Sequence, residues 1–284
     1  MQLSISQTST SSSATTTTTT TRLHIHITSM MPRRNARVFA FLAAVVSQLR
    51  LVGAFTSLSP PRHLSSLAAA SNDASSGDAA NELFASAGWP AIKKDLDECP
   101  VFTVANKKGQ PLQYSVGGSA MPFFFVDLDA AREELLKAQA DSTISDMDGM
   151  DGIDIIPFPL GDAFMMMETG KGVIVPSKQA IEDAGAPKDA SPVGQQVPLF
   201  ACMTITQEGR DGKPLLPLFF VKQEVLEAID EALAFDGDDG QDEFAITCIS
   251  LQKAVELLTT NQQTAFNFLP PSKSLQHIKE YLEG

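Results

Sequence analysis

Few side chains in this 284-residue sequence have the types and spacing that catalysis or metal binding requires. Cys99, Cys202 and Cys248 lie far apart and form no C-x-x-C pair, so they predict neither a zinc site nor a disulfide framework. Cys202 and Cys248 stand in apolar stretches, which is typical of buried cysteines rather than of nucleophiles. His277 is the one histidine after residue 71, and we expect it on the polar side of a helix. These residues predict no catalytic group, no metal and no cofactor.

Two other patterns are similar to ligand-binding loops only superficially. Residues 209–213 (GRDGK) contain two glycines but not the spacing of a phosphate-binding loop, and they are expected to form a hairpin turn. The acidic stretches 141–151 and 236–243 lack the glycine and glutamate positions of a calcium-binding loop. We therefore expect solvated loops here and no metal site.

Three consecutive methionines are the candidates for a binding surface. Met165, Met166 and Met167 have unbranched, polarizable side chains, which suit irregular cores as well as surfaces that accept many partners. Two interpretations remain open at this stage: these side chains fill a core, or they form the adaptable part of an exposed surface.

The elements that would position these residues follow an internal repeat. Four short motifs recur in the same order, at offsets of 98, 95, 91 and 95 residues. The pairs are PVFTV at 100–104 with PLFAC at 198–202, MPFFFV at 121–126 with LPLFFV at 216–221, IIPFPL at 155–160 with ITCISL at 246–251, and PSK at 176–178 with PSK at 271–273. Chance does not readily produce four matches in one order, so two copies of one unit are predicted.

Each copy is predicted to contain a β-hairpin followed by alternating helices and strands. The fold class is therefore α+β: two similar β-hairpin/α repeats of about 95 residues form one pseudo-two-fold body, with mostly antiparallel sheet. A leading helical segment should precede them, with Pro90 opening its second helix. Inward-facing helix residues are expected at Leu128, Leu135 and Leu136 in the first copy, and at Val225, Leu226, Ile229, Leu233, Leu275, Ile278 and Leu282 in the second.

Charge divides the chain into a basic head and an acidic body. Residues 1–71 carry six arginines and no acid, whereas residues 72–284 carry a net charge of −19. An acidic body argues against nucleic-acid binding, which needs clustered Lys and Arg. The predicted segments are 1–29 (low complexity), 30–54 (signal peptide), 55–72 (transit-like), 73–98 (leading helices), 99–186 (first repeat), 187–196 (linker) and 197–284 (second repeat).

The head reads as a targeting sequence. Residues 38–46 form an apolar run of nine behind a basic stretch, too short for a good membrane span, and Ala54 stands at the predicted cleavage site. Either Met30 or Met31 is the expected start of translation. Phe55 opens a Ser-rich, Arg-containing, acid-free segment. This order resembles the bipartite presequence of complex plastids, in which a Phe follows the signal cleavage site. No other run is apolar enough to span a bilayer.

The body resembles the twenty-two-kilodalton component family of the protein translocon at the chloroplast inner envelope. The resemblance rests on CPVFTVAN at 99–106, PFFFVDLDA at 122–130, IIPFPL at 155–160, VPS at 175–177, VPLF at 197–200 and PLFFV at 217–221. It implies a non-enzymatic protein, soluble or peripheral, that assists precursor proteins between the envelope membranes in a chaperone-like way. It also implies plastid localisation, in the intermembrane space or at an inner envelope membrane, with precursors and translocon subunits as partners. Met165, Met166 and Met167 become candidate precursor-binding residues.

Two alternatives remain open. The first is a plastid enzyme with a carboxylate-based site, which would need paired carboxylates in a deep pocket. The second is a carrier of small apolar ligands, which would need an enclosed cavity between the two copies.

Overall fold

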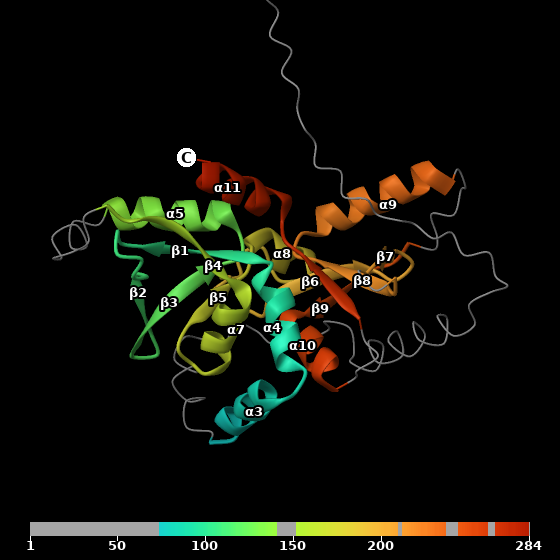
Figure 1. Cartoon of the computed structure of the whole chain (residues 1–284). Coiled ribbons are helices and arrows are strands. Elements are labelled where there is room, and N and C mark those ends of the chain that lie inside the picture. Colours follow the sequence, from blue (N-terminus) through green and yellow to red (C-terminus); the bar gives the residue numbers. More distant parts are fainter. Residues whose placement is uncertain (1–73, 141–151, 210–211, 237–243, 261–264, 284) are drawn as a thin grey trace, which may run out of the picture.

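The computed structural model describes residues 74–140, 152–209, 212–236, 244–260 and 265–283 (Figure 1). The predicted targeting segments, the acidic stretch 141–151 and most of the acidic stretch 236–243 therefore lie outside the described residues. Within these described ranges, ten strands fall into two sheets. They are β1 (Pro100–Ala105), β2 (Gln113–Val116), β3 (Ser119–Phe125), β4 (Asp154–Pro159), β5 (Val173–Val175), β6 (Pro198–Cys202), β7 (Gln207–Glu208), β8 (Pro214–Phe219), β9 (Ile246–Ser250) and β10 (Phe266–Leu269).

Eight helices accompany these strands in the described part of the chain. They are α3 (Ala74–Ala85), α4 (Trp89–Asp97), α5 (Leu128–Ala140), α7 (Leu160–Glu168), α8 (Lys178–Asp183), α9 (Lys222–Asp236), α10 (Leu251–Thr260) and α11 (Ser272–Glu283). None of the described helices is long and apolar enough to cross a membrane. The mixture of helices with two mainly antiparallel sheets confirms the predicted α+β class.

The two sheets pair their strands in the same combination. The first has the order β2-β3-β1-β4, with β5 parallel to β3, and the second has the order β10-β8-β6-β9, with β7 on β8. β1 is antiparallel to β3 and β4, as β6 is to β8 and β9. Residue pairs define the register: Phe102 lies opposite Phe125 in one sheet, and Phe200 lies opposite Phe219 in the other.

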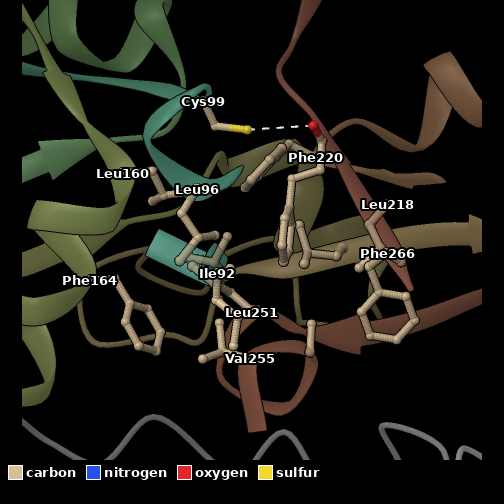
Figure 2. Packing of buried hydrophobic residues seen from close by; sticks show 14 of the residues in the cluster. Ile92, Leu96, Cys99, Leu160, Phe164, Leu218, Phe220, Leu251, Val255 and Phe266 are labelled. Atoms are coloured by element: carbon tan, nitrogen blue, oxygen red, sulfur yellow. Dashed lines mark hydrogen bonds between the residues drawn. The ribbon is translucent and has the colours of Figure 1, made fainter. Parts of the chain in front are cut away.

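The central core lies between the sheets and is completed by helices α4, α7 and α10. Because side chains alternate along a strand, Val101 of β1 and Leu199 of β6 both face this core. In Figure 2, Ile92 and Leu96 of α4 point toward Leu251 of α10. The leading helix is thus an internal part of the body rather than an appendage.

Proline and capping residues explain where several helices begin. The structure confirms Pro90 in the first turn of α4, immediately after a break that ends α3. Ser177 caps α8, since its hydroxyl accepts a hydrogen bond from the Ala180 N–H. The carboxylate of Asp127 accepts one from the Asp129 N–H at the start of α5.

The outer face of each sheet is covered by helices from both halves of the chain. Phe125 and Val175 of the first sheet pack with Leu128 of α5, and Ile278 of α11 joins this cluster although it comes from the end of the chain. Figure 1 shows α11 beside α5 over the first sheet. Reciprocally, Ala180 of α8 packs into the outer cluster of the second sheet. The last helix of each half therefore contributes to the core of the other half.

Several predicted inward-facing residues are exposed in the structure. Leu136 is 65% exposed, Leu226 40%, Leu275 46% and Leu282 77%. In each helix the buried stripe includes small or polar residues instead: Ala131 and Ala138 in α5, Ala228 and Ala232 in α9, and Ser274 in α11. The spacing of apolar residues was right for Leu128, Val225 and Ile229, which are buried, and wrong for these four leucines.

The prediction for His277 was also wrong. Its ring packs edge-on against Phe102, with ring centres 5.5 Å apart, so it lies on the inner side of α11 rather than on the polar side. The prediction failed because the buried stripe of α11 is rotated toward Ser274 and Ile278.

Candidate functional site: a half-buried apolar rim

The three candidate methionines lie at the end of α7, on the edge of the central core. Leu160, Ala163 and Phe164 of this helix are fully buried, whereas Met165, Met166 and Met167 are each half-buried. All three side chains pack against the central cluster. Each methionine therefore lies partly in the core and partly at the surface, between the two interpretations of a core-filling and a surface-forming side chain.

Other elements also contribute half-buried apolar side chains that pack on the central cluster. Eight half-buried apolar residues pack on the central cluster, and we call this set the apolar rim: Leu83, Phe84, Phe158, Met165, Met166, Met167, Met203 and Leu258. They come from both halves of the chain and from α3. The sequence pattern pointed only to the methionine run, because the other five residues come from separate elements and their shared contact with the central cluster is a product of the fold.

Two contacts locate the methionines relative to their neighbours. The amide Nε2 of Gln252 lies 3.6 Å from the Met167 sulfur, which places the end of α7 beside the start of α10. A Cβ added at Gly172 would lie 3.3 Å from the Met166 Cβ. The contact at the Met167 thioether is weak and adaptable, which suits a surface that changes its packing.

An ion-pair network of three residues links α7 to α4. The Lys93 Nζ lies 2.6 Å from Asp97 Oδ2 and 2.8 Å from Asp162 Oδ1. Hydrogen bonds to Asp162 and Asp97 raise the pKa of Lys93, so the ammonium is retained at neutral pH. The two carboxylates converge on a cation, so the pair is a structural link between helices and not an acid–base dyad.

Glu168 is the titratable group closest in sequence to the methionines. It ends α7, and burial raises the pKa of its carboxyl. A half-buried carboxylate at a helix C-terminus is unfavourable in its charged form, because both desolvation and the helix dipole oppose the charge.

Cys99 and Cys202 are buried, whereas Cys248 is half-buried. The Cys99 thiol is 3.6 Å from the Phe268 carbonyl oxygen of the other half, the contact drawn as a dashed line in Figure 2. Burial raises the pKa of Cys99 and of Cys248 to about 12, so both thiols stay protonated at neutral pH. Within the described ranges, no group of three His, Cys, Asp or Glu residues is arranged to hold a metal ion.

Two sheets joined through a shared core, with their closing helices exchanged, define a protein of the α+β class. Comparison with known families then identifies it: the model of the Tic22-like family matches residues 38–281, and the chain belongs to this family. The match begins inside the segment predicted as a signal peptide. No curated protein matches the chain.

Solved structures of similar fold are also found. Tic22 from Plasmodium falciparum is 18% identical, with a TM-score of 0.57, over 68% of this chain and 98% of the other. Anabaena Tic22, described as a protein of protein transport, is 16% identical, with a TM-score of 0.51, over 68% of this chain and 96% of the other. At these identities the likeness shows the fold.

Proposed function

We propose that this protein is a non-catalytic component of plastid protein import that holds precursor polypeptides, in a chaperone-like way, as they pass between envelope membranes. Membership of the Tic22-like family is the observation that carries the proposal. It would act in the intermembrane space or at the surface of an inner envelope membrane, with precursors and translocon subunits as its partners.

The apolar rim is the proposed contact surface for precursors. Its three methionines combine exposure with attachment to a rigid core, so they can adapt to varied apolar side chains without unfolding the body. The net charge of −19 on residues 72–284 attracts basic, Ser-rich precursor segments and raises the encounter rate more than the affinity.

A binding experiment with the protein and a labelled synthetic transit peptide tests this proposal. Affinity should fall as salt concentration rises, because screening weakens attraction between the acidic body and the basic peptide. Met166→Glu should weaken binding while the protein still unfolds cooperatively, and Met166→Leu should leave binding close to wild type. A Met166→Glu protein that does not fold would show that Met166 only fills the core. A wild-type protein with no affinity for unfolded polypeptide would remove the proposed function.

Delivery to the plastid is proposed to depend on the basic head. Residues 30–54 would act as a signal peptide cleaved after Ala54, and the segment that begins with Phe55 would act as a transit peptide. This interpretation is supported by the order of charge and hydropathy in the sequence.

We further propose that the two halves are copies of one ancestral unit, comprising residues 99–186 and 197–284 with a linker at 187–196. The shared combination of strand pairs supports this, since both sheets have two antiparallel neighbours of a central strand and one parallel addition. The result would be one pseudo-two-fold body.

A further inference from the structure

The two sheets differ at their outermost strands. β4 ends the strand order of the first sheet, and β9 ends that of the second. Neither strand pairs with another strand along its outer side within the residues the structure describes. An unpaired outer strand presents backbone N–H and C=O groups that can pair with another chain.

Two backbone hydrogen bonds determine at which residues of β4 and β9 the backbone N–H and C=O groups point away from the paired strand. We call these residues the outward positions. The Leu160 N–H donates to the Cys99 carbonyl at 3.1 Å, and the Leu251 N–H donates to the Val197 carbonyl at 2.8 Å. In an antiparallel pair, such bonded positions alternate with positions whose N–H and C=O groups face away from the neighbour. With the observed registers, the outward positions are 155, 157 and 159 in β4, and 246, 248 and 250 in β9.

The outer edge of β4 has no free backbone donor. Pro157 and Pro159 occupy two of its three outward positions, and proline has no N–H. At the third position, the Ile155 N–H donates to the Asp154 carboxylate at 2.7 Å. Proline and charge at an edge are features that prevent strand addition in natural proteins.

The outer edge of β9 lacks these features. Its sequence, ITCIS, contains no proline and no charge. The N–H groups of Ile246 and Cys248 make no hydrogen bond to another described residue, and both residues are only half-buried. The equivalents of Pro157 and Pro159 are the half-buried Cys248 and the buried Ser250, so β9 lacks the prolines that block the edge of β4.

We propose that the edge of β9 binds an extended segment of a precursor polypeptide as an added strand of the second sheet. This inference rests on the proposed function and names a site and a binding mode for it. Backbone hydrogen bonds give such a site affinity without dependence on sequence, and side chains at alternate positions add specificity.

The net charge of residues 72–284 and the side chains beside β9 indicate which kind of polypeptide would pair with this strand. A second copy of this chain would bring together two bodies of −19 each, whereas a basic segment without acids would be attracted. Ile246 and Cys248 face the same side of the sheet, where they pack, as Phe244 does, against the outer cluster of the second sheet. The occupant is therefore an extended, basic segment with apolar side chains at every second position.

The decisive variant makes β9 similar to β4. Cys248→Pro removes an outward N–H at the position where β4 carries Pro157, and Cys248→Ala is the matched control that keeps it. The probe is a fluorescent peptide, long enough to pair with all of β9, that alternates valine with serine or arginine. Its dissociation constant should rise about tenfold for Cys248→Pro and change little for Cys248→Ala.

A second measurement changes only the ligand, so it does not depend on the folding of the variant. Two versions of the peptide carry N-methyl groups at alternate residues, one at odd and one at even positions. Strand addition predicts that wild-type protein loses affinity for one version and keeps it for the other, because only every second peptide N–H faces β9.

The outcomes separate the inference from the function on which it rests. Suppose that the wild type binds both methylated peptides as tightly as the unmethylated peptide, and that Cys248→Pro binds the unmethylated peptide as tightly as the wild type. The edge of β9 is then not the site, although precursor binding stands. If the wild type binds no peptide at all, the proposed function and the site both fail. Concentration-dependent dimerisation that Cys248→Pro abolishes would assign the edge to a second copy and would overturn the proposal.

Discussion

At the scale of single residues, the junction between α4 and α7 depends on a very close approach. A Cβ added at Gly161 would lie 2.9 Å from the Lys93 carbonyl oxygen, close to the Asp97 carboxylate as well. Gly161→Ala should therefore lower the free energy of unfolding by about 1–3 kcal/mol, because backbone atoms must move to accommodate the methyl group. Urea denaturation measures this directly.

Gly88→Ala is the matched control for that substitution. A Cβ at Gly88 would come no closer than 4.0 Å to the Ile92 side chain, so its effect should be within about 0.5 kcal/mol. Equal effects at the two positions would mean that α4 and α7 are not packed as closely as described.

Glu168 gives stability a pH dependence. Its pKa is raised in the folded state, so folding favours the protonated form, and its contribution to stability is lost as pH rises through the folded pKa. Glu168→Gln should therefore raise the melting temperature at neutral pH, and the difference should disappear at pH values below the ordinary carboxyl pKa. Thermal melts across pH, with the exposed Glu227→Gln as control, test this. A variant less stable than wild type at neutral pH would contradict the assignment.

At the scale of elements, sequence patterns predicted most of the fold. The α+β class and the second leading helix that opens at Pro90 agree with the structure. These features depend on local chemistry, which is present in sequence. The buried faces of α5, α9 and α11 were partly wrong, because alanine and serine stripes become visible only when the opposing surface is known.

The motif comparison does not reproduce the register of the strands in the two sheets. The motif comparison aligns Phe125 with Phe220, but in the sheets Phe125 and Phe219 occupy equivalent positions, opposite Phe102 and Phe200. A shift of one residue exchanges the two faces of a strand. Phe220 accordingly lies in the central core, whereas Phe125 lies in an outer cluster. The apolar rim and the open edge of β9 were not predicted, since both require residues that only the fold brings together.

The exchange of α8 and α11 predicts that neither half is stable alone. A chain ending at Ala186 loses Ile278 of α11 from its outer cluster and also exposes the central core that the second sheet covers. Such a fragment should be poorly soluble or lack a cooperative unfolding transition, as measured by calorimetry. A soluble fragment with dispersed amide resonances would show that the halves fold independently.

At the scale of the whole molecule, targeting and binding should depend on opposite charges. The head carries +6 and the body −19, so removal of the head leaves a body suited to basic polypeptides. The proposed bipartite signal requires Phe55. A fusion of the head to a fluorescent protein should fail to enter the plastid when it carries Phe55→Ala, whereas Thr56→Ala should enter normally. Normal entry of the Phe55→Ala fusion would contradict the bipartite interpretation.

The central claim is that this protein contacts precursors while they cross the plastid envelope. Site-specific crosslinking in isolated plastids tests it most directly, with a photoreactive amino acid at Met166 and a precursor arrested during import. The account predicts crosslinks to the arrested precursor that disappear when import is allowed to finish, and no crosslinks from a matched probe at exposed Leu282, far along the chain on α11. Absence of precursor crosslinks from Met166 and from Cys248 during active import would contradict the account.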